Sequence, residues 1–428
     1  MDNLAEQETG TDQERRLAAL RTELEKEGVD GFLITTADEY QGEYPPASAR
    51  RLAWLSGFTG SAGALAVLPD EAAIFVDGRY TVQARQQVDA GDYQQCGLSP
   101  GYASVAEWLK DNAKPGSKIA YDPWLHTQNF IETMDRALKG KGVDLVAIAN
   151  NPIDALWHDR PAIPQAPVQV HPAERAGEES ASKRKRVGKS VADKGCDAVM
   201  ITAPDSIAWL LNIRGGDVSH TPLALSYAML HADGKVDWFI DEAKLSDNVR
   251  KHVGADVRIH SPEEMEQALV ALGRDKKTVL YDAVRSAAWF HQQLEEAGAT
   301  IKRGDDPCLL PKACKNPVEI EGMRQAHIRD GVALAKLLCW LDQEAPKGHV
   351  MELDVEDKLL AFRQEQADFQ EPSFATIAGS GEHGAIVHYK ASEKSNKSLE
   401  NNSLFLLDSG GQYLDGTTDV TRTIVVGT

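Results

Sequence analysis

Two acidic residues near the end of the chain could do chemistry by their type and spacing. Asp408 ends the apolar run at 404–407, and Asp419 precedes a second apolar run at 423–426. Two carboxylates at the ends of apolar strands repel and desolvate each other unless protons or cations neutralise them. Hard divalent cations with oxygen ligands are the usual remedy. The pattern is compatible with a metal pair, although aspartates that cap strand ends and turns show the same spacing.

The register of these two runs decides whether the carboxylates face each other. Residues 409–418 join the runs and contain three glycines. Pairing centred on residues 413–414 places Asp408 opposite Asp419, whereas a tight turn at residues 415–416 shifts that register. Facing carboxylates are therefore compatible with the sequence but not required by it.

A histidine in the same segment is a third candidate. His388 follows the apolar stretch 384–387, and we expect it to lie on a strand. A lone strand histidine is usually a packed core or edge residue, so the residue types alone do not decide its role.

The part of the chain that precedes these residues contains the same series of predicted elements twice. Residues 26–30 lead into the strand-like run 31–35, and residues 193–197 lead into 198–202 in the same way. A helical stretch precedes each run and further apolar strands follow it, with a tryptophan at matching places, Trp54 and Trp209. The ordered repeat predicts two α/β domains of one architecture.

Two boundaries separate the parts of the chain. Residues 161–172 carry four prolines and read as an extended linker, and the second boundary falls near residues 303–307. Beyond it, Asn316 can cap a helix, Pro317 suits the first helical position and Glu319 can complete a capping box. We therefore expect domains at 1–160, 161–305 and 306–428.

Composition excludes several classes of partner. The chain has 65 acidic and 46 basic residues, a net charge of −19, and such a surface repels nucleic-acid phosphates. Its five cysteines are scattered without a CxxC pair, which is typical of a reducing compartment. No apolar run approaches the ~18 residues of a membrane span, and the polar residues 1–10 do not resemble a signal peptide. The sequence predicts a cytoplasmic protein that binds neither nucleic acid nor membranes.

Several motifs together resemble one family. Residues 408–423, DSGGQYLDGTTDVTRT, look like the first metal-ligand segment of Xaa-Pro aminopeptidases, which are pita-bread metallopeptidases of family M24. The stretches WLSGFTGSAG (54–63), DGRY (77–80), IAWLLNIRGGD (207–217) and KNPVEIEGMR (315–324) resemble the other parts of the long, three-domain form. The resemblance implies two duplicated creatinase N-terminal-like (RNase H-like) α/β domains, followed by the first part of an α+β pita-bread catalytic domain.

The resemblance also implies an activity and a site. It makes Asp408 and Asp419 ligands of a dinuclear centre, usually manganese, with zinc or cobalt as alternatives. Asp419 would bridge both ions, and His388 would be the active-site histidine that binds substrate near the scissile bond. Such an enzyme uses metal-activated water to hydrolyse the N-terminal Xaa-Pro bond of peptides with proline at the second position. The family resemblance further implies a homodimer.

One departure from the family pattern shapes the expectation for this chain. The remaining ligands, one histidine and two glutamates, lie C-terminal to this hairpin in the family, whereas the sequence ends at Thr428. We therefore expect the N-terminal portion of a longer enzyme that is inactive by itself. Two rivals remain: a non-catalytic dimerisation or binding protein built on creatinase-like N-domains, and another pita-bread hydrolase such as a prolidase. For Arg79, Arg214, Asp217 and His220, domain-packing ion pairs are the favoured interpretation.

Overall fold

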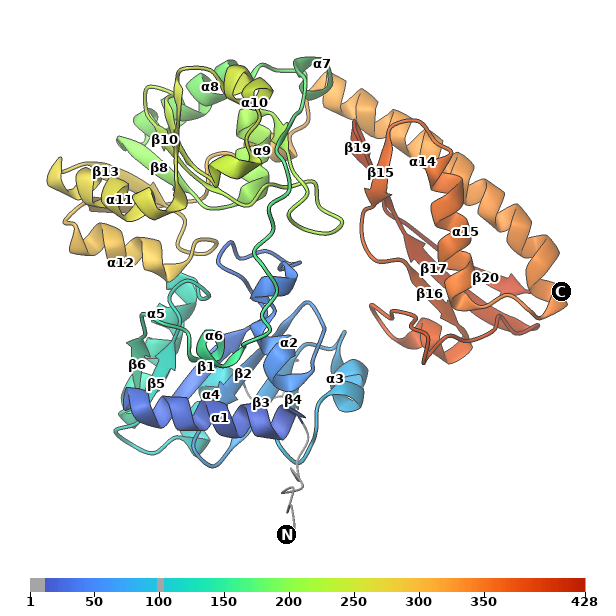
Figure 1. Cartoon of the computed structure of the whole chain (residues 1–428), viewed down its shortest axis with the longest axis horizontal. Coiled ribbons are helices and arrows are strands. Elements are labelled where there is room, and N and C mark those ends of the chain that lie inside the picture. The colour runs from blue at the N-terminus through green and yellow to red at the C-terminus, as the bar shows by residue number, and fades with distance from the viewer. Residues whose placement is uncertain (1–11, 98–103, 428) are drawn as a thin grey trace, which may run out of the picture. The chain divides into compact units, whose positions relative to one another are not determined.

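A computed structural model describes residues 12–97 and 104–427 of the chain (Figure 1). Residues 1–10, which do not resemble a signal peptide, and Thr428 lie outside the described residues. Within the described part, no helix has both the length and the apolarity needed to cross a membrane.

The first part of the chain forms a mixed six-stranded sheet. Its strand order is β4-β3-β2-β1-β5-β6, with β1 antiparallel to β2 and parallel to β5. The sheet is central because β3 is buried along its whole length. The strands are β1 (Gly31–Thr35), β2 (Gly63–Val67), β3 (Ala72–Val76), β4 (Gln94–Gly97), β5 (Lys118–Tyr121) and β6 (Asp144–Ala147).

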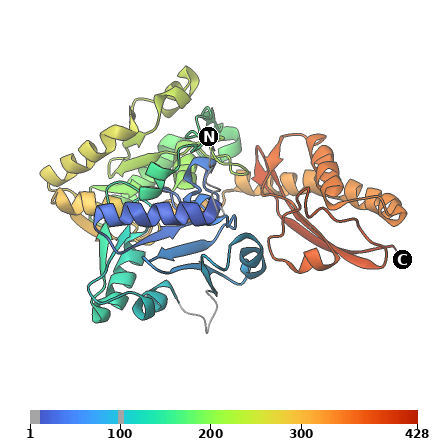
Figure 2. The same ribbon diagram turned by 60° about the horizontal axis from the view of Figure 1, so that its bottom comes forward.

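Helices cover both faces of this sheet, as Figure 2 shows for α1 on one side and α4 and α5 on the other. Leu17, Leu20 and Leu24 of α1 belong to one buried cluster, and Trp108 and Met134 belong to another. The helices are α1 (Asp12–Glu27), α2 (Arg51–Ser56), α3 (Thr81–Gln87), α4 (Val105–Asn112), α5 (Gln128–Leu138) and α6 (Pro152–Leu156).

A second six-stranded sheet repeats the first strand for strand. Its order, β12-β11-β10-β8-β13-β14, has the same topology, which confirms the predicted duplication. The strands are β8 (Ala198–Ile201), β10 (Tyr227–His231), β11 (Val236–Phe239), β12 (Val257–His260), β13 (Thr278–Tyr281) and β14 (Thr300–Arg303). The helices are α7 (Ala173–Ala176), α8 (Ser180–Asp193), α9 (Pro204–Leu211), α10 (Asp247–Val253), α11 (Met265–Arg274) and α12 (Ala288–Glu296).

Short elements complete the front half. The proline-bearing stretch before β7 has no regular structure, as the sequence predicts. Strand β7 (Gln169–Val170) pairs with β9 (Ile213–Arg214). The 3-10 helices are η1 (Ala47–Ala49), η2 (Lys139–Lys141), η3 (Glu242–Lys244), η4 (Pro262–Glu264), η5 (Ala345–Lys347) and η6 (Gly381–Ala385).

The last part of the chain begins with the predicted helix. After α13 (Leu309–Ala313), α14 (Pro317–Glu344) starts at the Asn316 cap, and the capping box with Glu319 is present. Helix α15 (Glu352–Gln364) follows. The domain boundaries expected at residues 160 and 305 stay a prediction.

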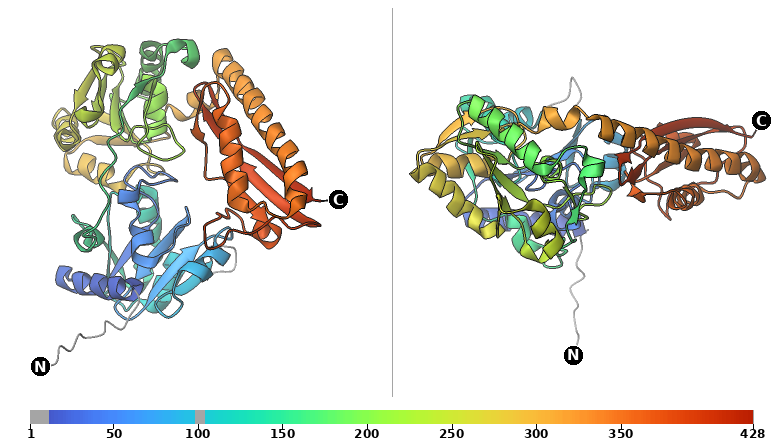
Figure 3. Two further views of the ribbon diagram at one scale, coloured as in Figure 1. Left: turned by 45° about the vertical axis from the view of Figure 1, so that its right-hand side comes forward. Right: turned by 90° about the horizontal axis from the view of Figure 1, so that it is seen from above.

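Two small antiparallel sheets lie against α14 and α15, which Figure 3 shows from two directions. Their orders are β15-β18-β19 and β16-β17-β20. Leu337 and Leu341 of α14 and Leu359 of α15 form a core with Phe405 and Leu407 of β17. The strands are β15 (Phe369–Pro372), β16 (Ile377–Ser380), β17 (Ser403–Ser409), β18 (Gly411–Tyr413), β19 (Gly416–Thr417) and β20 (Val420–Val426).

Candidate functional site

The two candidate aspartates lie on one long hairpin with an unexpected turn. Gln412 pairs with Thr417 and Tyr413 with Gly416, so the chain turns at Leu414 and Asp415. The turn is not at residues 415–416, because Gly416 lies in strand β19 and packs closely against α14. A Cβ atom there would lie 2.9 Å from the Cβ of Ala326 in α14. The glycine allows strand β19 to approach the helix closely, which fixes the turn one residue earlier.

This turn gives a register in which Asp408 lies opposite Thr421, so the facing arrangement with Asp419 is not formed. The two carboxylates nevertheless share a face of the hairpin. Asp419 precedes Thr421 by two residues, and side chains two residues apart along an extended chain point to the same side. Asp408 and Asp419 are therefore diagonal neighbours.

Electrostatics agrees with this placement. Partial burial raises the pKa of Asp419, and the nearby negative charge of Asp408 raises it further. The hydroxyl of Thr421 donates to Oδ1 of Asp408 over 2.8 Å and orients that carboxylate. Two mutually repelling carboxylates with free oxygens form a donor set that suits a hard divalent cation.

The backbone between β17 and β18 fixes the separation of the two aspartates. A Cβ atom at Gly410 would lie 2.0 Å from the carbonyl oxygen of Thr418, so only glycine fits this crossing. The N–H of Gly411 donates to Oγ1 of Thr418 over 2.9 Å, and Ser373 Oγ donates to the Thr418 carbonyl over 2.8 Å. The strand ends that carry Asp408 and Asp419 are thereby tied together.

A buried ion pair anchors the hairpin to both helices. Nε of Arg363 in α15 donates to Oδ1 of Asp330 in α14 over 2.7 Å, and each side chain is only 1% exposed. Nη2 of Arg363 also donates to the hydroxyl of Ser409, next to Asp408, over 3.1 Å. The Tyr413 hydroxyl donates to Asp330 Oδ1 over 3.0 Å. The ion pair thus contacts the first arm of the hairpin at two points, Ser409 in β17 and Tyr413 in β18.

His388 is not on a strand, and that expectation is wrong. It lies in a turn closed by a hydrogen bond from the N–H of Tyr389 to the carbonyl of Ile386, 3.1 Å. The apolar stretch before it is not a strand: Gly384 and Ala385 end η6, and Ile386 and Val387 follow in a bend and a turn. His388 is exposed and has φ = 57°, in the left-handed region. Such a conformation costs about 1–3 kcal/mol for a residue other than glycine and needs support from its surroundings.

The four other polar residues fall into two groups. Asp217 forms a buried ion pair with Lys244, 2.8 Å, as predicted, whereas Arg79 forms a local, partly exposed ion pair with Asp77, 2.8 Å, and not the domain-packing pair that was expected. Arg214 and His220 make other contacts instead. Nη1 of Arg214 donates to the carbonyl of its neighbour Ile213.

His220 joins the second sheet domain to the hairpin. Its N–H donates to Oε2 of Glu371 over 3.1 Å, and its own carbonyl accepts from Nε2 of Gln412 over 2.8 Å. His220 therefore forms hydrogen bonds to side-chain groups of the hairpin sheet, and the ion pair expected for it is wrong.

The described residues offer few side chains for binding a metal ion. They contain no cluster of three or more histidine, cysteine, aspartate or glutamate side chains able to hold an ion. The hairpin brings together two carboxylates, which fit one side of a divalent-cation site by their charge and oxygen chemistry.

Sequence reasoning missed Asp330 and Arg363. A signal was present in α15, whose buried stripe is Glu352, Val355, Leu359 and Arg363. Charged residues in line with an apolar stripe are buried only when they are paired.

Comparison with known families matches the architecture in three segments. Residues 16–156 and 159–319 match creatinase/prolidase N-terminal domains, and residues 321–428 match metallopeptidase family M24. These matches confirm the predicted fold class of two creatinase-type domains followed by pita-bread sequence.

Individual relatives agree along nearly the whole chain. Aminopeptidase P2 of Arabidopsis thaliana is 34% identical over 93% of this chain, which spans 60% of that protein. A probable Xaa-Pro aminopeptidase P of Coccidioides posadasii (strain RMSCC 757 / Silveira) is 36% identical over 97% of this chain, which spans 69% of that protein. The crystal structure of X-prolyl aminopeptidase from Caenorhabditis elegans, described as a cytosolic enzyme with a di-nuclear active site, superposes with a TM-score of 0.92. That similarity has 32% identity and covers 98% of this chain and 71% of the nematode chain.

The buried ion pair gives a stability prediction. Asp330→Asn leaves the Arg363 guanidinium buried without a counter-charge, so we expect a loss of about 3–5 kcal/mol in the free energy of unfolding. Glu365→Gln is the matched control, because Glu365, the residue after α15, pairs with Lys336 of α14 at an exposed position. The control should lose at most about 1 kcal/mol. Equal losses in urea unfolding of the two variants would contradict the assigned role.

Glu356, one turn after Glu352, gives a pH prediction. Burial raises its pKa to about 7 from 4.5, and its Oε1 atom is buried without a hydrogen-bond partner. Because the folded pKa exceeds the unfolded one, the group's contribution to stability is lost as pH rises from 4.5 through 7. Glu356→Gln should therefore be more stable than wild type by about 1–2 kcal/mol at pH 8, and this difference should vanish near pH 4.5. A pH-independent difference in urea unfolding would contradict this account.

Proposed function

Because the chain belongs to the Xaa-Pro aminopeptidase P family, we propose that it carries part of the catalytic apparatus of a metallo-aminopeptidase. The reaction is hydrolysis of the N-terminal Xaa-Pro peptide bond. The observation that supports the proposal most is the pair of carboxylates, Asp408 and Asp419, on one face of a hairpin anchored by a buried ion pair.

In this proposal, Asp408 and Asp419 would hold two divalent cations through their carboxylate oxygens. Manganese is the proposed metal because carboxylate oxygens suit it, with zinc or cobalt as alternatives. Divalent ions there would supply Lewis-acid chemistry and a nucleophile at neutral pH. Thr421 orients Asp408 through its hydroxyl, and the Gly410 crossing holds the two carboxylates at a fixed separation.

His388 is the proposed substrate-binding and catalytic histidine. His388 is exposed in a turn, and an imidazole can donate a hydrogen bond to the carbonyl of the scissile bond. A peptide bond before proline has no N–H, so recognition must come from the carbonyl and from the shape of the proline ring. An imidazole donor suits that requirement.

The proposed setting is a cytoplasmic homodimer that acts on peptides with proline at the second position. The net charge of −19 disfavours nucleic acid as a partner. The nematode relative is described as cytosolic, which supports the location.

Activity measurements test the proposal. With Mn²⁺, the full-length protein should release the first residue from Xaa-Pro peptides of three or more residues and leave the matching Xaa-Ala peptides intact. Asp419→Asn should lower kcat/KM at least about 100-fold, since a ligand is lost. Asp357→Asn, at an exposed position of α15, is the control and should match wild type.

Three results would overturn the proposal. Cleavage limited to Xaa-Pro dipeptides would indicate a prolidase. A full-length wild-type protein that cleaves no Xaa-Pro peptide with Mn²⁺ would contradict the catalytic proposal and favour a non-catalytic role. Full activity of Asp419→Asn would exclude Asp419 as a ligand.

A further inference from the structure

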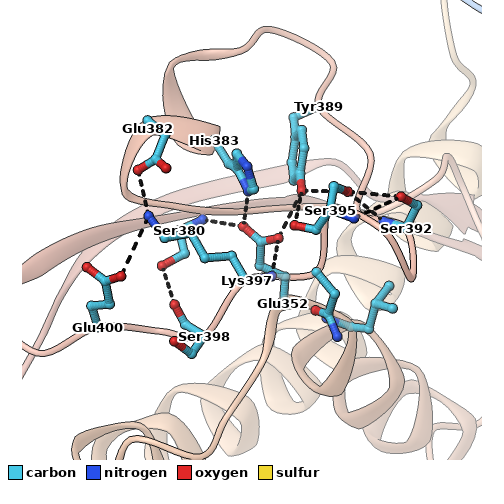
Figure 4. A network of polar contacts seen from close by, with 12 residues as sticks. Glu352, Ser380, Glu382, His383, Tyr389, Ser392, Ser395, Lys397, Ser398 and Glu400 are labelled. Atoms are coloured by element: carbon cyan, nitrogen blue, oxygen red, sulfur yellow. Dashed lines mark hydrogen bonds and ion pairs between the residues drawn. The ribbon is translucent and has the colours of Figure 1, made fainter. Parts of the chain in front are cut away.

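The carboxylate of Glu352 lies at the centre of a polar network around the segment that carries His388 (Figure 4). Its side chain is fully buried at the start of α15. Oε1 accepts hydrogen bonds from the N–H of Ser380 and from Nδ1 of His383, both at 2.8 Å. One oxygen therefore fixes the end of β16 and the 3-10 helix that follows it.

The second oxygen contacts the other side of the same segment. Oε2 accepts from the hydroxyl of Tyr389 over 2.9 Å and from the N–H of Lys397 over 3.1 Å. The four donors come from the beginning, the middle and the end of residues 380–397. A single carboxylate thus closes this stretch of chain into a fixed loop.

His388 is coupled to the network through Tyr389, its neighbour in the chain. The Tyr389 ring stacks on the ring of His383 with centroids 4.4 Å apart, and both side chains bond to Glu352. The N–H of Tyr389 closes the turn in which His388 has φ = 57°. Fixing Tyr389 therefore fixes the left-handed backbone from which the His388 ring projects.

We propose that Glu352 is a positioning residue for His388, because its carboxylate holds the loop in the one conformation that presents the imidazole. This inference rests on the proposed function, in which His388 acts on the substrate. The role requires a carboxylate. Four donors converge on Glu352, and an ionised carboxylate offers about four acceptor sites and no competing N–H.

An amide of the same shape cannot do this. In Glu352→Gln, the NH₂ group must face either the Ser380 N–H or the Lys397 N–H, and neither backbone donor can reverse its role. One end of the loop would lose its anchor while the volume of the core stays unchanged. Glu356→Gln, the same substitution one helical turn later, removes a carboxylate with an unpartnered oxygen and is the matched control.

A double-mutant cycle in the full-length protein, with Mn²⁺ and an Xaa-Pro peptide, tests the inference. Glu352→Gln should lower kcat/KM about 10–100-fold, and Glu356→Gln should match wild type. Combined with His388→Ala, Glu352→Gln should add less than about 3-fold to the loss from His388→Ala alone, because both changes remove one function. Losses that multiply, or a Glu352→Gln enzyme as active as Glu356→Gln, would overturn the inference. Inactive wild-type enzyme would overturn the proposed function instead.

Nuclear magnetic resonance of the wild-type chain gives a second readout. It does not depend on whether a variant folds or on whether the enzyme is active. Donation to Glu352 requires the proton of neutral His383 to lie on Nδ1, and the Ser380 and Lys397 amides to exchange slowly with solvent. The ¹⁵N shifts of His383 should therefore report the Nδ1-protonated tautomer. An Nε2-protonated ring, or rapid exchange of both amides, would overturn the inference.

Discussion

The buried ion pair between Asp330 and Arg363 is the interaction on which the candidate site depends. Neither charge could stay in the core alone, because an unpaired buried charge is far more costly than a paired one. Each partner also contacts the hairpin, Arg363 at Ser409 and Asp330 at Tyr413. The pair therefore sets where Asp408 lies relative to the two helices, and the Gly410 crossing carries that placement to Asp419.

Helix α15 serves both halves of the site. Its buried stripe starts with Glu352, which holds the loop of His388, and ends with Arg363, which contacts the hairpin of Asp408 and Asp419. Val355 and Leu359 lie between them in the hydrophobic core. A rigid helix with one charged anchor at each end fixes the histidine and the two carboxylates in a common frame, which is what catalysis by preorganised groups requires.

Local signals in the sequence predicted much of this organisation, and tertiary contacts decided the rest. The duplication, the Asn316 capping box and the strands around Asp408 follow from short-range pattern and capping chemistry. The hairpin turn did not, because Gly416 is required for contact with α14 and not for the turn itself. The turn at His388 was missed because its apolar neighbours suggest a strand, whereas a glutamate more than thirty residues earlier fixes the loop.

The central claim is that the hairpin carboxylates bind metal, and anomalous diffraction tests it most directly. Crystals of the protein grown with Mn²⁺ should be measured on both sides of the manganese absorption edge. The account predicts an anomalous peak within roughly 2.0–2.6 Å of carboxylate oxygens of both Asp408 and Asp419. A well-ordered hairpin without such a peak, or manganese bound only elsewhere, would contradict it.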